Sequence, residues 1–283
     1  MFASTSGMPR QSLAETIREC ERVGLDSVEL SSGAGEGDDL DFLTRTGAQI
    51  RFLVHNYFPA PAEPFVLNLA DQDPGILQRS LALCEHAIDL SSRLGAPFYS
   101  LHAGFRATFD PASLGRQLQY GHVWNYGTAY STFVKSLEHL LAYGRSREVA
   151  ILVEPNVLAP FNLTNGTNEV ALICEAWEVT RLMADIPDSN LGVLLDTGHL
   201  RVTAETLMFD RTEFLDEVAP FIRAFHVHDN DGSSDAHRPI APDSWVCKVL
   251  QRAEFATLPI VDEAKFSSLA EMRNHVRWLT CTV

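Results

Sequence analysis

The chain has 283 residues, 46% of them hydrophobic, so it is long enough to bury one large core. Its 37 acidic and 22 basic side chains give a formal charge of −15, which disfavours nonspecific binding to nucleic acid and to anionic membranes. No apolar run approaches a membrane span, and no signal peptide is visible at the N-terminus. Five scattered cysteines without a Cys-x-x-Cys pair favour free thiols in a reducing cytoplasm. A cytoplasmic protein with a small-molecule substrate is therefore expected.

Short apolar runs alternate with amphipathic segments of helical length along the chain, which is typical of βα units that build a parallel sheet. Strands are predicted at residues 2–4, 27–30, 50–55, 98–102, 150–154, 192–196, 224–228 and 258–263. Helices are predicted at residues 12–23, 75–94, 128–143, 169–185, 211–219, 244–253 and 267–278. Gly24, Gly95 and Gly144 stand where helix C-caps are expected.

Six of the predicted strands run into a histidine or a carboxylate at their carboxyl ends. The clearest is the sixth, where Leu-Leu leads straight into Asp196 and, three residues later, His199. The other strand ends carry His55, His102, Glu154, His226 and Glu263. An open doubly wound sheet gathers ligands at one crevice, whereas a closed barrel brings every carboxyl end to one mouth. We therefore predict a single (β/α)8 barrel domain over residues 1–283, with a metal site at its mouth.

A lone histidine at a strand end is usually a hydrogen-bonded structural residue, but the whole set resembles the xylose-isomerase-like barrel superfamily. That superfamily includes sugar isomerases and epimerases and also endonuclease IV. Residues 56–59 (Asn-Tyr-Phe-Pro), 64–68 and 99–105 are similar to stretches of bacterial proteins called sugar phosphate isomerase/epimerase. The resemblance implies that one divalent ion is bound by Glu154, Asp196, His226 and Glu263, and that Glu154 and Glu263 also move protons.

The larger three-metal pattern of endonuclease IV adds five further positions, and all of them hold suitable residues in this chain: His55, His102, His199, Asp235 and His237. Carboxylates and imidazoles without thiolates suit zinc, manganese, magnesium or cobalt. Strand alternation puts His228 on the same face as His226. The resemblance assigns the ligand role to His226 and leaves His228 or Asp229 to support it, and His228 is also a candidate contact for substrate.

The number of ions, from one to three, is linked to the charge of the substrate. Four carboxylates neutralise two divalent ions, so a third ion would leave positive charge for a phosphate or an enediolate to balance. A single ion among surplus carboxylates would instead favour a neutral sugar.

The loops that follow the predicted strands should form the binding face of the barrel. Residues 31–41 contain four acids and no base, and residues 56–70 contain no Lys or Arg. The segment 103–127 is rich in aromatic residues, of which Trp124 and Tyr126 are expected to stack on a sugar. Arg106 and Arg238 are the best candidate anchors for an anion. A face that grips a DNA duplex needs more cations than this.

We therefore expect a metal-dependent isomerase or epimerase of a sugar or sugar phosphate, active in carbohydrate metabolism. One of Glu154 and Glu263 would remove a proton beside the carbonyl and the other would return it, through an enediolate. The alternative is an endonuclease IV-like, metal-dependent phosphodiester hydrolase that acts on abasic DNA. A third possibility is a non-catalytic sugar-binding protein, against which the intact Glu154 and Glu263 argue. Pairing of chains into a homo-oligomer is left open by the sequence.

Overall fold

The computed structural model describes residues 1–9, 11–31, 40–46 and 49–283, so most of the acidic loop at 31–41 lies outside the described residues. Within these ranges, eight parallel strands pair in chain order and close when β1 pairs with β8. The predicted (β/α)8 barrel is therefore confirmed, and each strand lies within two residues of its predicted bounds. The strands are β1 (Phe2–Ser4), β2 (Ser27–Leu30), β3 (Arg51–His55), β4 (Phe98–His102), β5 (Ala150–Glu154), β6 (Leu191–Asp196), β7 (Ile222–Val227) and β8 (Ile260–Asp262).

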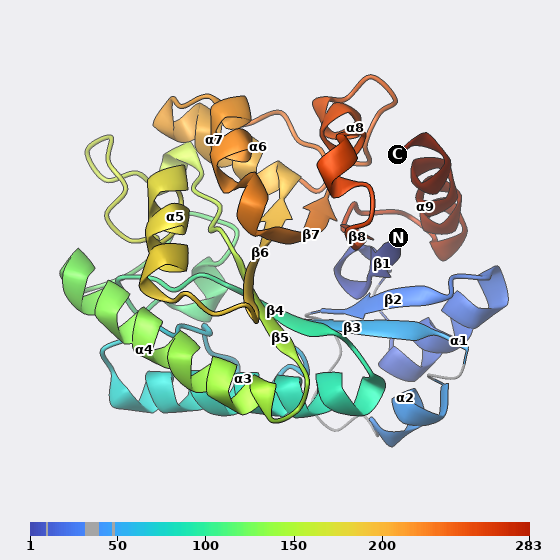
Figure 1. Cartoon of the computed structure of the whole chain (residues 1–283), viewed down its shortest axis with the longest axis horizontal. Helices are drawn as coiled ribbons and strands as arrows, with labels where there is room; N and C mark the ends of the chain where they lie inside the picture. The colour runs from blue at the N-terminus through green and yellow to red at the C-terminus, as the bar shows by residue number, and fades with distance from the viewer. Residues whose placement is uncertain (10, 32–39, 47–48) are drawn as a thin grey trace.

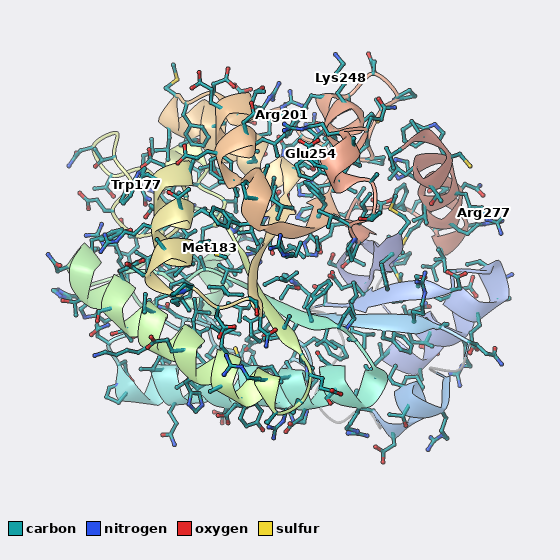
Figure 2. All side chains as sticks on the ribbon, viewed as in Figure 1. Trp177, Met183, Arg201, Lys248, Glu254 and Arg277 are labelled. Atoms are coloured by element: carbon teal, nitrogen blue, oxygen red, sulfur yellow. The ribbon has the colours of Figure 1, made fainter. Side chains whose placement is uncertain are left out.

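Helices surround the strands, with α3 and α4 packed side by side and the two chain ends close together where α9 meets β1 (Figure 1). Charged side chains such as Lys248 and Arg277 point away from the barrel into solvent (Figure 2). No helix in the described ranges combines the length and the apolar character needed to cross a lipid bilayer. The helices are α1 (Leu13–Val23), α2 (Asp41–Thr46), α3 (Pro74–Leu94), α4 (Tyr126–Arg145), α5 (Ala176–Asp185), α6 (Thr197–Leu207), α7 (Arg211–Val218), α8 (Trp245–Leu250) and α9 (Leu269–Thr282).

Two apolar clusters hold the barrel together, one between strands and helices and a smaller one contributed mainly by the strands. The smaller cluster includes Leu53, Leu152, Leu194, Ala224 and Val261. Each of these residues stands two positions before a strand-end candidate ligand, so strand alternation points both side chains to the same face. The apolar cluster thus fills one level of the barrel and the polar side chains gather at the level above it.

The ends of the helices follow local sequence signals in two of the three predicted cases. Gly24 and Gly95 adopt left-handed conformations, with φ of 76° and 67°, and cap α1 and α3 as predicted. The prediction is wrong for Gly144, because α4 continues to Arg145 and Glu148 takes the left-handed conformation instead, with φ of 58°. Gly144 is needed for close packing, since a Cβ there would lie 2.6 Å from the carbonyl oxygen of Val149.

The predicted helix at residues 169–185 is wrong in its first part, because α5 begins only at Ala176. The preceding apolar residues Val170, Leu172 and Cys174 are buried in an irregular segment. Asn156 fixes this segment by donating from Nδ2 to the carbonyl of Leu172 at 2.9 Å. The apolar residues at positions 170–174, which suggested the start of a helix, are therefore buried parts of an irregular segment.

The sequence pattern does not predict α2 or α6. Helix α6 starts directly after β6, and Asp196 is its N-cap, accepting a hydrogen bond from the backbone N–H of His199 at 2.8 Å. The carboxylate that ends the strand is consequently held by the first turn of the helix.

Three histidines, His86, His139 and His275, lie in segments whose sequence predicts helices, which predicts surface positions for them. His86 and His139 are exposed, as predicted. The prediction is wrong for His275, which is half-buried and bridges the Asp262 carboxylate, at 2.7 Å, and the Ile240 carbonyl, at 3.1 Å. Two buried acceptors hold this ring in place.

Candidate metal centre

Four side chains from consecutive strands meet at the mouth of the barrel. Glu154, Asp196 and His226 end or nearly end β5, β6 and β7, and Glu263 follows β8. All four are buried, Glu154 and His226 completely. His226 Nδ1 lies 3.8 Å from Glu154 Oε1, 4.0 Å from Asp196 Oδ2 and 3.4 Å from Glu263 Oε2. One imidazole nitrogen therefore faces three carboxylate oxygens from three different strands.

Several of these buried atoms have no hydrogen-bonding partner among the described residues. They are both carboxylate oxygens of Glu154, Oδ2 of Asp196 and Nδ1 of His226. Leaving such groups unpaired in a buried site is costly, so they indicate an additional ligand. Candidate ligand atoms of these three residues lie within 4.8 Å of one another. A donor set of carboxylate oxygens and an imidazole nitrogen fits a divalent cation.

Glu29 is a buried site residue that the sequence reasoning missed. It lies on β2 and its Oε2 is 2.9 Å from Nε2 of His226, on the opposite side of the ring from the carboxylate cluster. An acceptor at Nε2 keeps the proton there and leaves the Nδ1 lone pair free for a cation. The signal in the sequence is an acidic residue between two apolar strand residues, Val28 and Leu30.

Three further predicted residues surround Glu154. His55 Nε2 and His102 Nδ1 lie 3.4 Å and 3.6 Å from Oε2 of Glu154, and His199 Nδ1 lies 2.9 Å from Oε1. His55 is oriented by Ser100, whose hydroxyl is 2.9 Å from its Nδ1. Imidazoles therefore approach both oxygens of this carboxylate at ion-pair distances, without the geometry of a hydrogen bond.

The remaining predicted residues extend the network towards solvent. Asp235 Oδ2 lies 2.9 Å from His237 Nε2 and 3.5 Å from His199 Nε2. His228 Nε2 lies 3.2 Å from Asp196 Oδ1 and 3.3 Å from Asp235 Oδ1, and neither of its ring nitrogens has a hydrogen-bonding partner in the described ranges. All nine residues of the larger predicted set therefore belong to one continuous cluster, to which the structure adds Glu29 and His228.

Charges within the cluster stabilise one another. Burial raises the pKa of Glu154, but the neighbouring imidazoles, His102 foremost, outweigh it and hold the pKa below its usual range. Burial lowers the pKa of His226, but the carboxylates of Glu263 and Glu29 outweigh it and raise the pKa well above its usual value. These shifts favour the ionised form of Glu154 and a positive charge beside it, which a bound cation would supply in place of imidazole protons.

The predicted substrate contacts of the loop at 103–127 have protein partners. Arg106 donates from Nε to the carbonyl of Trp124 at 3.1 Å, and its guanidinium lies 5.9 Å from the centre of the Tyr126 ring. Tyr126 donates its hydroxyl hydrogen to Oε1 of Glu178 at 2.9 Å. These contacts tie the Arg106 side chain to the backbone of Trp124 and the Tyr126 side chain to α5.

Arg238, the other candidate anion anchor, pairs with Asp231 at 2.7 Å. Of the five residues predicted to contact substrate, His228 is the one that the structure brings into the buried cluster.

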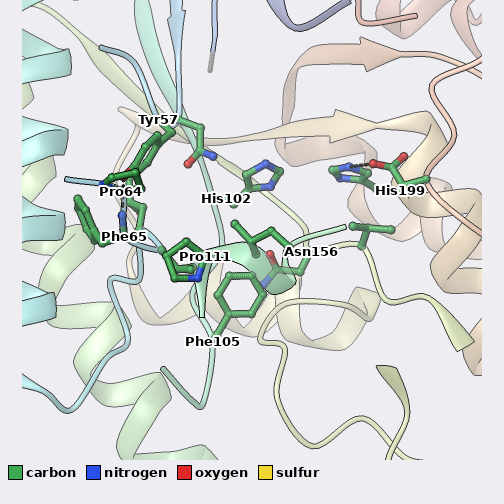
Figure 3. A pocket seen from close by; sticks show the side chains of 14 residues that line it. Tyr57, Pro64, Phe65, His102, Phe105, Pro111, Asn156 and His199 are labelled. Atoms are coloured by element: carbon green, nitrogen blue, oxygen red, sulfur yellow. Dashed lines mark hydrogen bonds and ion pairs between the residues drawn. The ribbon is translucent and has the colours of Figure 1, made fainter. Parts of the chain in front are cut away.

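A cavity of about 450 Å³ opens beside the cluster. His102, His199 and Asp235 line one part of it, and Figure 3 shows His102 and His199 facing it across from Tyr57 and Phe65. Arg106, Trp124, Tyr126 and Arg238 are not among the residues that line this cavity. A molecule the size of a sugar derivative therefore fits against the exposed edge of the cluster.

A barrel of eight parallel strands with a mouth of histidines and carboxylates is typical of metal-dependent barrel enzymes. The family profile described as "Xylose isomerase-like TIM barrel" matches residues 13–277. The chain belongs to this family.

Similar proteins are found among curated sequences and solved structures. The chain is 22% identical over 239 residues to the fructoselysine 3-epimerase of Shigella flexneri, covering 82% of this chain and 77% of the relative. The fold is similar to that of a D-tagatose 3-epimerase-like protein, with a TM-score of 0.73, 16% identity and coverage of 99% and 96%. It is also similar to the structure of an L-ribulose 3-epimerase, with a TM-score of 0.67, 14% identity and coverage of 98% and 86%.

Substitution of Gly198 by Ala tests the packing that positions His228. A Cβ at Gly198 would lie 1.9 Å from Cε1 of His228, so the ring or the first turn of α6 has to move. We expect Gly198→Ala to lower the free energy of unfolding by about 1–3 kcal/mol, as overpacked sites do. Urea unfolding followed by circular dichroism measures the change.

Gly121→Ala is the matched control, because a Cβ there would meet no described atom within 4 Å. Its unfolding midpoint should stay close to that of the native protein. Equal midpoints for both variants would contradict the packing assigned to His228.

Proposed function

We propose that the protein is a metal-dependent isomerase or epimerase of a sugar. The observation that carries this proposal is the set of unpaired, buried donor atoms that converge from β5, β6 and β7, flanked by the carboxylate of Glu263. Membership of the xylose isomerase-like family and similarity to proteins named as sugar epimerases support it.

Glu154, Asp196, His226 and Glu263 would hold one divalent ion, and zinc, manganese, magnesium and cobalt all suit these donors. Up to two more divalent ions would be held by the other five residues of the larger set: His55, His102, His199, Asp235 and His237. A bound ion would polarise the substrate carbonyl and the adjacent hydroxyl, making the intervening C–H more acidic.

The protein's own residues would bind the sugar and move the proton. Ser4 and Ser6 donate hydrogen bonds to Oε1 of Glu263, at 3.1 and 3.0 Å, which orients this carboxylate and leaves Oε2 towards the centre of the site. Glu154 approaches from β5, separated from β8 by two strands. One carboxylate would remove a proton from the carbon beside the carbonyl, and the other would return a proton to the same or the opposite face.

A phosphodiester hydrolase that acts on abasic DNA is the second candidate, favoured by the presence of all nine residues of the larger constellation. Two observations place it second. The curated relatives are named as epimerases, and the arginines predicted to anchor an anion, Arg106 and Arg238, are engaged within the protein. Gripping a duplex requires cations that replace phosphate counterions.

Substitutions at Asp196 and Glu29 test the metal site. Asp196→Ala should abolish tight binding of Mn²⁺, because it removes a buried donor. Glu29→Gln should weaken binding by about 10- to 100-fold, the usual effect of changing a residue that orients a ligand. Calorimetric titration of the metal-free variants with Mn²⁺ measures both affinities, and circular dichroism checks that each variant is folded.

Asp231→Ala is the control. Asp231 is exposed and follows β7, in the segment that also holds Asp235 and His237, but its side chain pairs with Arg238 outside the cluster. This variant should bind Mn²⁺ as the native protein does. Native affinity in Asp196→Ala would rule out this metal site.

Solvent exchange tests the proton chemistry. Candidate ketoses and their phosphates are incubated with the Mn²⁺-loaded protein in heavy water, and the true substrate should gain deuterium at the carbon beside its carbonyl. Glu154→Gln and Glu263→Gln should lower turnover by ~10²–10⁴-fold, the usual contribution of a positioned acid or base, and should lose the exchange.

Glu138→Gln, on the exposed face of α4, is the matched control and should keep native turnover. An active enzyme whose product carries no solvent deuterium would indicate a hydride shift or hydrolysis and would exclude the proposed mechanism.

A further inference from the structure

The cavity beside the metal cluster is mainly apolar. His102, His199 and Asp235 form its polar end, whereas Tyr57, Phe65, Phe105 and Leu114 line much of the rest (Figure 3). We infer that it holds an uncharged, apolar substituent of an unphosphorylated sugar whose polar end faces the cluster. This inference rests on the proposed function and names the class of its substrate.

Hydrogen bonds and ring contacts fix the walls of the cavity. The Tyr57 hydroxyl accepts the backbone N–H of Phe65 at 2.8 Å, and the two rings meet edge to face with centres 5.5 Å apart. Asn156, which also lines the cavity, donates to the backbone carbonyls of Ala103 and Gly104, both at 3.0 Å. A ligand therefore meets walls that are already formed, which lowers the entropic cost of binding.

The apolar surface is partly open to water. Leu114 on the cavity wall is 48% exposed, one of the more exposed large hydrophobic residues in the described chain. An apolar group of the ligand would cover this surface, and the removal of both apolar surfaces from water would contribute to the free energy of binding.

A phosphate group has no cationic partner on these walls. None of the fourteen described residues that line the cavity is Lys or Arg, and Asp235 adds an acidic side chain. Transfer of a dianion onto these apolar walls, away from the metal cluster and without a paired charge, is unfavourable.

One polar atom beside the cavity has no hydrogen-bonding partner in the described structure. It is the buried Oδ1 of Asn56. The backbone around it is fixed, because Tyr99 donates its hydroxyl hydrogen to the Asn56 carbonyl at 2.7 Å. Asn56 therefore adds an unpaired amide oxygen beside the cavity, whereas the apolar walls take the substituent.

Binding to the Mn²⁺-loaded protein is measured by calorimetry with four probes: D-fructose, D-fructose 6-phosphate, 1-O-benzyl-D-fructose and 6-O-benzyl-D-fructose. Burial of about 100 Å² of apolar surface predicts that at least one benzyl ether binds about 10- to 100-fold more tightly than fructose. The phosphate should bind no more tightly than fructose. Leu114→Asp should reduce the affinity for the benzyl ether about tenfold, and more than it reduces the affinity for fructose.

Phe161→Asp is the matched control, because Phe161 is 42% exposed and is not among the residues that line the cavity. It should leave all four affinities unchanged. Tighter binding of fructose 6-phosphate than of both benzyl ethers, or no advantage of either ether over fructose, would overturn the inference. Solvent deuterium exchange is recorded with the same probes. If every probe lacks exchange while the benzyl preference persists, the proposed function fails and the assignment of the cavity stands.

Discussion

Closure of the barrel combined with strand alternation determines where the chemistry of this protein can occur. Five strands, β3 and β5 to β8, contribute an apolar residue to the interior and, two positions later, a polar residue at the mouth, as in Leu152 and Glu154 or Leu194 and Asp196. Because the strands are parallel and closed, these polar residues meet without any loop having to bring them together. The positions of the candidate ligands thus depend on the rigid core, which suits a site that needs fixed geometry.

The same arrangement concentrates charge where water does not reach. Carboxylates of this kind destabilise a fold unless they are paired, so the surrounding groups that hold them are part of the site. Glu29 holds His226, the first turn of α6 holds Asp196, and Ser4 holds Glu263. The atoms left unpaired by these contacts are those that face the common centre. Local hydrogen bonds therefore fix the positions of these side chains, and the atoms that they leave unpaired explain why a cation would stabilise the site.

Much of the fold and of the cluster could be predicted from the sequence, because both depend on short-range patterns. A strand that ends in Asp196 or Glu154 is visible in a few residues. Glu29 could not be assigned in this way, since its partner His226 lies 197 positions away and only barrel closure brings them together. The apolar cavity is built from residues near 57–67, 105–114 and 156–157, whose juxtaposition depends on how the loops pack.

The predicted substrate contacts show what residue type in the sequence cannot reveal. Arg106 and Tyr126 are residue types that often bind sugars or anions, but their partners Trp124 and Glu178 can be identified only from the structure. Residue type alone does not reveal whether a polar group is already satisfied.

The central claim is that the strand-end cluster holds a divalent cation required for activity. Elemental analysis of the purified protein, before and after treatment with a chelator, tests it most directly when paired with solvent-exchange activity on the true substrate. One to three ions per chain are expected, with loss of activity on their removal and recovery on addition of Mn²⁺ or another suitable divalent ion. A protein that binds no ion and keeps full activity after chelation would contradict it.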